Sequence, residues 1–203
     1  MKRIYQLEYN PIDIEPLRTQ EYYKSANFDN ANSLALFSDD CIKGFLDNEI
    51  FINMCDLSVH YDGSHRFYGI FAHSKCNKDI GTFVKVSINN TATSPKKDKV
   101  EIDSTEFDDY FSVYSDNKII ATQLLTSDIM ELLVDFYKKY FLDYEIVFRN
   151  NTIYTRFFTG PMFEPKIFGN SMNKQLLFTY YCILKFITEV SQKVNKVLRE
   201  MEV

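Results

Sequence analysis

Apolar residues recur at helical spacing in two stretches of the chain, with polar residues between them. The first stretch follows Thr126, Ser127 and Asp128, which are competing N-cap residues, and Asp128 with Glu131 resembles a capping box. Its apolar positions are Ile129, Leu132, Leu133, Phe136 and Tyr140. The second stretch repeats at intervals of four and three residues, like the a/d seam of a heptad: Leu176, Tyr180, Ile183, Ile187, Val190, Val194, Val197 and Met201. The pattern predicts a mid-chain helix and a long amphipathic C-terminal helix.

Alternating apolar and polar positions predict strands from Cys41 onward. Between residues 50 and 61 the apolar parity changes, from Ile50, Ile52 and Met54 to Cys55, Leu57, Val59 and Tyr61. This change predicts a β-bulge near Met54, or two short strands. Asp62-Gly63 predicts a hairpin turn, with the returning strand at residues 66–73.

Further strands are predicted at residues 80–88, near Val113 and at residues 118–122. Asn150-Asn151 predicts a second hairpin between the alternating segments 144–148 and 153–158. Residues 89–99 and 161–169 are predicted loops. Because the connections are short, we expect a mostly antiparallel sheet in an α+β fold with one mid-chain helix and a long C-terminal helix.

Pro11 and Pro16 disfavour a helix near the start of the chain, so residues 1–20 are predicted to be a lead-in segment. Residues 22–37 are compatible with a short helix. No Pro/Gly-rich linker and no internal repeat divides the remainder, and 203 residues suffice for a core without metal or disulfide support. Residues 21–203 are therefore expected to form one α+β domain.

Composition and charge exclude several classes of function. The net charge is −5, and the one dense basic cluster, around Lys96 and Lys97, is short and mixed with acidic residues, which argues against nucleic-acid binding. The N-terminus has no apolar signal region, and the most apolar stretch, residues 176–190, is too short and polar to span a bilayer. The sequence predicts a cytoplasmic protein with reduced, buried cysteines, and peripheral membrane association stays compatible with it.

Cys55, His60, His73 and Cys76 form the best candidate metal site, because two sulfurs and two imidazoles suit tetrahedral zinc. Their spacing matches no common zinc finger, and Cys55 and His60 have opposite parity on a continuous strand. A structural role for the four residues therefore competes with the metal site, and no cofactor is predicted.

An acidic group, Glu101, Asp103, Glu106, Asp108 and Asp109, lacks the spacing and glycine of a calcium-binding loop. Nucleophile elbows, phosphate-binding loops and dinucleotide fingerprints do not occur in the sequence, and no catalytic residue is assigned. These observations favour a non-enzymatic protein. The alternative is a metal-dependent hydrolase that uses the Cys/His set or the acidic group.

The segment from Glu106 to Pro165 resembles a bacterial family of uncharacterised proteins, domain of unknown function 3137. Its motifs are Phe111-x-Val113-Tyr114-Ser115, Ala121-x-x-Leu124-Leu125-Thr126, Met130-Glu131 followed by Leu133, and Phe163-Glu164-Pro165. Upstream, Asp40-x-Ile42-x-Gly44 and Phe67-x-Gly69-x-Phe71 fit more loosely. Asn117, Thr122 and Ser127 depart from the family pattern.

The resemblance supplies no catalytic residues, and the matched positions have the character of a core and a helix cap. It implies a role at the envelope, although the membrane segments that many relatives carry are missing from this sequence. We expect a protein-binding module, with a partner at the cytoplasmic side of the envelope. A lipid-headgroup binder that uses Lys96 and Lys97 is a further hypothesis.

The C-terminal helix bears on the partner as well. Leu177, Leu184 and Phe186 add hydrophobic surface outside the seam, and a helix that is apolar on more than one stripe must bury more than one face. It either packs across its own sheet or provides a surface for self-association or a protein partner. Truncation after Phe168 distinguishes the two: it unfolds the domain in the first case and only separates the subunits in the second.

Overall fold

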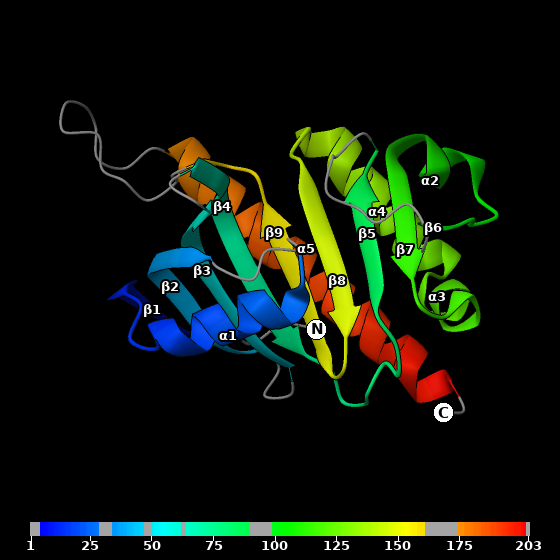
Figure 1. Cartoon of the computed structure of the whole chain (residues 1–203), viewed down its shortest axis with the longest axis horizontal. Helices are drawn as coiled ribbons and strands as arrows, with labels where there is room; N and C mark the ends of the chain where they lie inside the picture. Colours follow the sequence, from blue (N-terminus) through cyan, green and yellow to red (C-terminus); the bar gives the residue numbers. More distant parts are fainter. Residues whose placement is uncertain are drawn as a thin grey trace.

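The computed structural model describes residues 5–28, 34–46, 50–61, 64–89, 99–160 and 174–201. Within them, a nine-stranded sheet has the order β1-β2-β3-β4-β9-β8-β5-β7-β6, and all its strand pairs are antiparallel (Figure 1). The strands are β1 Tyr5–Ile12, β2 Ala35–Leu46, β3 Ile50–Tyr61, β4 Ser64–Lys75, β5 Val84–Ile88, β6 Lys99–Val100, β7 Phe111–Ser115, β8 Tyr144–Arg149 and β9 Thr152–Phe157. The predicted α+β fold with an antiparallel sheet is confirmed.

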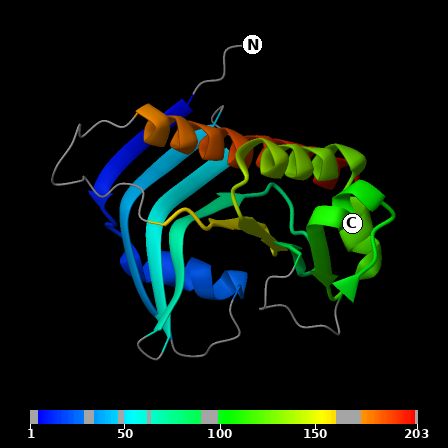
Figure 2. The ribbon, with the colours of Figure 1, turned by 90° about the horizontal axis from the view of Figure 1, so that it is seen from above.

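The helices cover both faces of the sheet (Figure 2). They are α1 Pro16–Ala26, α2 Thr105–Tyr110, α3 Lys118–Leu124, α4 Ser127–Tyr140 and α5 Lys174–Glu200. One core lies between the sheet and helices α4 and α5, and a smaller one lies beneath α1 around Tyr23, Phe28, Phe67 and Phe71. The sheet is therefore buried on both faces over its middle strands.

The start of the chain belongs to this sheet and is not a lead-in. Residues 5–12 form β1, which pairs with β2 at the edge of the sheet. Pro16 occupies the first turn of α1, where its missing N–H breaks no helical hydrogen bond. Pro11 therefore lies near the end of a strand and Pro16 at the beginning of a helix, and neither proline prevents regular structure in this segment.

Strand β3 does not change face at Met54. It pairs continuously with β4 from Ile52 to Val59, and its two apolar parities are buried in different cores, one under α5 and the other under α1. The bulge lies in β2, where the register with β3 shifts between Asp39 and Ile42 and Asp40 has a φ of 46°. The change in the parity of the apolar residues along β3 therefore reflects a strand that is covered on both faces.

Residues 118–122 form helix α3 and not the predicted strand. The Asn117 side chain accepts hydrogen bonds from the backbone N–H groups of Ile119 and Ile120, at 3.0 and 3.2 Å. An Asn N-cap satisfies amides that the first helical turn leaves free, and it outweighs the β preference of two isoleucines.

Most of the other local predictions on the described residues agree with the structure, although the strand predicted at residues 80–88 begins only at Val84. Helix α4 begins at Ser127 with Thr126 as its N-cap, one of the three predicted candidates, although the Asp128–Glu131 box lies inside the helix. Tyr61 of β3 pairs with Ser64 of β4, as the hairpin predicts, and Asn150 between β8 and β9 has a φ of 53°. Asp62-Gly63, residues 90–98 with Lys96 and Lys97, Phe163-Glu164-Pro165 and the Leu176 side chain lie outside the described residues.

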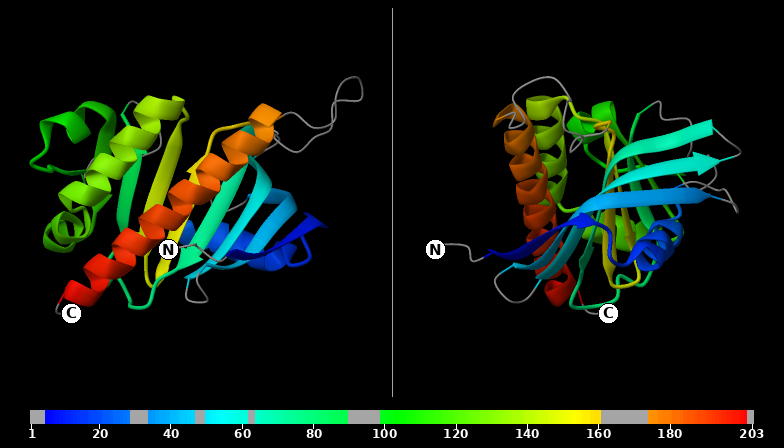
Figure 3. Two further views of the ribbon diagram at one scale, coloured as in Figure 1. Left: turned by 180° about the vertical axis from the view of Figure 1, so that it is seen from behind. Right: turned by 90° about the vertical axis from the view of Figure 1, so that its left-hand side faces the viewer.

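Helix α5 crosses the sheet diagonally (Figure 3). Its seam is buried from Tyr180 to Val194, and Phe186 outside the seam is buried against Phe136 and Tyr144. Leu177, in contrast, is 50% exposed. The helix thus packs on its own sheet with more than one stripe, while its first turns leave apolar side chains exposed. Across the described residues, no helix is long and apolar enough to cross a membrane.

A buried cluster of three charges lies in the sheet beneath α1. Glu145 on β8 contacts Arg156 on β9, with 2.6 Å from Arg156 Nε to Oε2, and lies 3.3 Å from Lys85 Nζ on β5. All three side chains are at most 2% exposed. Arg156 also donates to the Tyr23 hydroxyl, and Lys85 donates to the backbone oxygen of Phe28. The cluster therefore ties α1 and its following turn to three central strands.

Candidate functional site: a cleft between helix α1 and the sheet

The four predicted metal ligands do not gather in one place. Cys55 forms a disulfide with Cys41. His60 lies beside Ser58 and the Phe37 ring, and His73 packs under Tyr22. Among the described residues, the groups of three convergent ligand atoms contain neither the two histidines nor Cys76.

The disulfide corrects the prediction of reduced cysteines. The bulge in β2 sets two residues, Asp40 and Cys41, opposite the single residue Cys55 of β3. The Cα atoms of the two cysteines are 4.1 Å apart. Cys76 and Cys182 are free and buried, as the sequence predicted for all four cysteines.

The predicted acidic group surrounds α2 at the opposite end of the sheet. Glu106 pairs with Lys138 on α4, and partial burial raises the pKa of Asp108, with its acidic neighbours adding to the shift. In the part of the chain that the structure describes, these carboxylates do not form a group of three convergent ligand atoms. Their arrangement is that of charges on a surface helix.

A cleft of about 730 Å³ lies between α1 and the face formed by β1 to β4. Its floor contains a row of polar side chains that follows directly from the strand register. Glu8 pairs with Lys43, Lys43 with Asn53, and Asn53 with His73, so one residue from each of four neighbouring strands faces the same side. Cross-strand register therefore builds a polar floor from residues far apart in the sequence.

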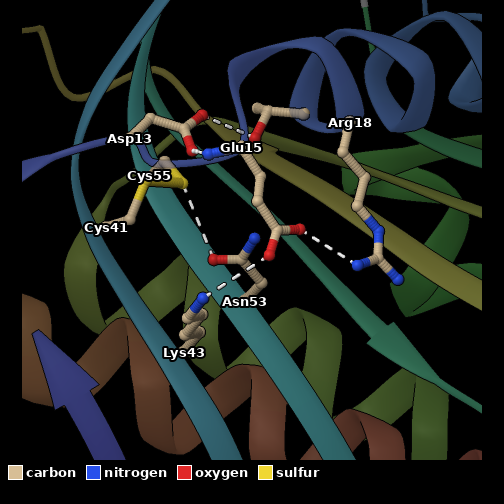
Figure 4. A network of polar contacts seen from close by, with 8 residues as sticks. Asp13, Glu15, Arg18, Cys41, Lys43, Asn53 and Cys55 are labelled. Atoms are coloured by element: carbon tan, nitrogen blue, oxygen red, sulfur yellow. Dashed lines mark hydrogen bonds and ion pairs between the residues drawn. A yellow bond between two sulfur atoms is a disulfide. The ribbon is translucent and has the colours of Figure 1, made fainter. Parts of the chain in front are cut away.

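The segment that leads into α1 forms one wall of the cleft (Figure 4). The Asp13 carboxylate accepts hydrogen bonds from the Glu15 backbone N–H, the Thr19 hydroxyl and the Ser38 hydroxyl. Glu15 in turn pairs with Arg18 at 3.0 Å and with Lys43 on β2 at 3.7 Å. Asp13 thus fixes the beginning of the helix, and Glu15 joins the helix to the floor.

The inner end of the cleft is organised around the ring of Tyr22. The His73 ring lies 3.9 Å from it between centroids, while Lys75 Nζ lies 5.0 Å and Arg18 Cζ 5.8 Å from its centroid. Burial, with a smaller contribution from Lys75 and Arg18, lowers the pKa of His73 to about 3. His73 is therefore a neutral imidazole at physiological pH, and its buried Nε2 has no hydrogen-bond partner within the described residues.

Two aromatic side chains form the outer rim. Phe45 on β2 is 45% exposed and contacts Phe51 on β3 edge to face, with centroids 5.4 Å apart. Beside them, a Cβ atom on Gly44 would lie 1.9 Å from the carbonyl oxygen of Gln6. Only glycine therefore allows β1 to lie so close at this edge of the cleft, which explains the glycine of the Asp40-x-Ile42-x-Gly44 motif.

Sequence reasoning found His73 but not its surroundings. Asn53 lies between Ile52 and Met54, and Lys43 follows Ile42, so each polar residue interrupts an apolar stretch, which is a usable signal. The contribution of α1 could not be read, because residues 1–20 were expected to lie outside the fold. The cleft combines exposed aromatic surface with basic, acidic and uncharged polar side chains.

Comparisons with known proteins give a family and a fold. A family model described as "Protein of unknown function (DUF3137)" matches residues 65–196, more than half of the 203-residue chain. No curated protein matches the chain. Among solved structures, the mycobacterial trehalose monomycolate transport factor A, TtfA, is similar over 96% of this chain and 87% of that chain, with a TM-score of 0.53 and 10% identity. At this identity the likeness concerns the fold alone.

Proposed function

Because the chain belongs to the DUF3137 family of proteins of unknown function, we propose a role from its own geometry: it is a non-catalytic binding module that receives a segment of a partner protein in the cleft between α1 and strands β1 to β4. The observation that carries this proposal is the cleft itself. Its volume of about 730 Å³ lies within the range of ligand-binding sites, and a helix and a sheet form its walls.

The chemistry of the nearby side chains supports binding over catalysis. The pKa of His73, about 3, makes its imidazole a weak base at neutral pH. Burial raises the pKa of the Cys76 thiol to about 12, which suppresses the reactive thiolate. Cys41 and Cys55 are joined in the disulfide and so supply no thiolate ligand. A metal-dependent hydrolase that used the predicted Cys/His set would lack these groups.

The disulfide also bears on the compartment. Disulfides persist in oxidising compartments and are rare in a reducing cytoplasm. The Cys41–Cys55 bond thus supports a site of action on the oxidising side of the envelope, in place of the cytoplasmic location predicted from the sequence.

Site-specific photocrosslinking in cells tests the proposal. A photoreactive phenylalanine at Phe45, on the rim of the cleft, is expected to capture a partner protein. The matched control carries the same residue at Phe141, which is 80% exposed after α4. A distinct adduct from position 45 alone supports the proposal. No adduct at position 45, or the same adducts from both positions, refutes it.

A further inference from the structure

We propose that the cleft recognises a carboxylate of its partner, held at the inner end between Arg18 and Lys75, with an adjoining apolar group on Phe45 and Phe51. This inference rests on the proposed function and specifies the chemistry of the bound segment. It requires an excess of positive charge and hydrogen-bond donors at the inner end, and apolar surface within reach of them.

The two cations converge on one aromatic ring. Arg18 from α1 and Lys75 from β4 both lie within 6 Å of the centroid of Tyr22. Both also act on the His73 imidazole beneath that ring, where their charges disfavour protonation. The electrostatic potential at the inner end is therefore positive, although the cleft as a whole carries both signs of charge.

The carboxylates of the cleft offset Arg18, which pairs with Glu15, but none of those in the described residues pairs with Lys75. Asp13 is 8% exposed and already accepts three hydrogen bonds, and Glu15 is shared between Arg18 and Lys43. Lys75 donates to two neutral oxygens, at 2.8 Å to Thr152 Oγ1 and 3.4 Å to Asn151 Oδ1. Within the described residues no carboxylate forms an ion pair with Lys75, so a ligand carboxylate adds the missing charge.

An unpaired donor points the same way. Asn10 Nδ2 lines the cleft, is buried, and has no hydrogen-bond partner in the part of the chain that the structure describes; His73 Nε2 is likewise without one, and it donates or accepts according to the tautomer of the neutral ring. An amide nitrogen can only donate, and a buried donor without a partner is unfavourable. A ligand rich in acceptor oxygens relieves this cost, whereas a ligand rich in donors does not.

The apolar part of the ligand follows from the rim. Phe45 and Phe51 lie on the two strands beside the polar row, and Phe45 exposes 45% of its surface. In binding sites, apolar and aromatic surface supplies contact area, and a few polar or charged groups fix the orientation of the ligand. The expected ligand is thus a protein segment with a carboxylate next to an aromatic or aliphatic side chain.

Small probes with and without the carboxylate test this chemistry. The probe is N-acetyl-phenylalanine, and its neutral counterpart is N-acetyl-phenylalaninamide, titrated into the ¹⁵N-labelled full chain and followed by the amide signals of β2 to β4. We expect binding of the acid about tenfold tighter than that of the amide, which corresponds to about 1.4 kcal/mol, because a hydrogen bond to a charged group is stronger than one to a neutral group. A third probe, N-acetyl-aspartyl-phenylalaninamide, distinguishes a side-chain carboxylate from a chain terminus, since it carries only the former.

Variants connect the affinity to the two cations. Arg18→Gln and Lys75→Gln are each expected to weaken binding of the tightest acidic probe about tenfold, and Lys75→Arg to restore most of it. The matched control is Arg199→Gln, which removes an exposed cation from the last turn of α5 and is expected to change nothing. Binding of both acidic probes no tighter than that of the amide, or equal affinities in Arg18→Gln, Lys75→Gln and Arg199→Gln, overturns the inference.

The crosslinking experiment separates this inference from the proposed function. A partner captured at Phe45 with undiminished yield in the Arg18→Gln and Lys75→Gln backgrounds refutes the carboxylate and leaves the binding module intact. Absence of any adduct at Phe45 removes both. An adduct that disappears with either cation supports both.

Discussion

The buried charge cluster offers a sharp test of how this fold is held together. Glu145→Gln removes the negative charge that Arg156 and Lys85 share, and leaves a side chain of the same size. Arg156 keeps its hydrogen bond to the Tyr23 hydroxyl and Lys85 keeps its bond to the Phe28 oxygen. The variant therefore isolates the effect of removing the Glu145 charge from beside two buried cations.

The expected loss follows from burial. The side chains of Glu145, Arg156 and Lys85 are 1–2% exposed, so water cannot replace the lost partner. Removing one member of a buried ion pair lowers the free energy of unfolding by about 3–5 kcal/mol. The nearby control, Glu106→Gln, breaks the Glu106–Lys138 pair, whose side chains are 69% and 42% exposed. Its expected loss is about 0–1 kcal/mol.

Urea unfolding followed by circular dichroism measures both losses, provided that the slopes with urea agree between variants. The loss in Glu145→Gln is expected to persist at high salt, because buried charges are screened little. If Glu145→Gln does not fold, Lys85→Met serves instead, since it leaves the Arg156–Glu145 pair intact and should remain measurable. A loss in Glu145→Gln no larger than that in Glu106→Gln would refute the reasoning.

Three further predictions concern the disulfide, the buried histidine and helix α5. Reducing Cys41–Cys55, which are 14 residues apart, should lower the free energy of unfolding by about 3 kcal/mol in urea titrations, and an unchanged midpoint with dithiothreitol would contradict this. His73 has a pKa of about 3 in the folded protein and near 6.5 in the unfolded chain. Its contribution to the free energy of unfolding is therefore fully present above pH 6.5 and is lost as the pH falls toward 3, by roughly 1.4 kcal/mol per pH unit. That slope between pH 6 and 4 should decrease in His73→Gln. Phe186→Ala should cost about 3–5 kcal/mol by creating a cavity under α5, whereas Leu177→Ala, at a 50% exposed position, should cost less than about 1 kcal/mol in the same assay.

Local sequence patterns were sufficient to predict several elements. Helix α4, helix α5 and the β8–β9 hairpin each follow from a periodicity or a turn signal within one contiguous segment of the chain. The hydrophobic pattern encodes these elements because their apolar faces must be buried whatever their neighbours are. The family resemblance also came from contiguous motifs, and the match over residues 65–196 confirms it.

Local sequence patterns gave wrong predictions where a contact with another residue or element determined the structure. The pattern of residues 118–122 predicts a strand, but the Asn117 side chain caps this segment as the beginning of helix α3. The parity change in β3 predicts a bulge, because the sequence does not show that α1 covers the second face of the sheet. The predicted metal ligands were separated for a related reason, since sequence spacing does not give distance across a sheet.

What the sequence by itself determined is the type of the longer elements, the α+β class and the family. What only the tertiary structure decided is their arrangement: β1 and α1 within the fold, the Cys41–Cys55 bond, and the cleft under α1. The cleft floor combines Glu8, Lys43, Asn53 and His73 from four strands. The physical reason is that periodicity is a local property of the chain, whereas register and strand order depend on contacts between segments that are distant in sequence and cooperate only in the folded state.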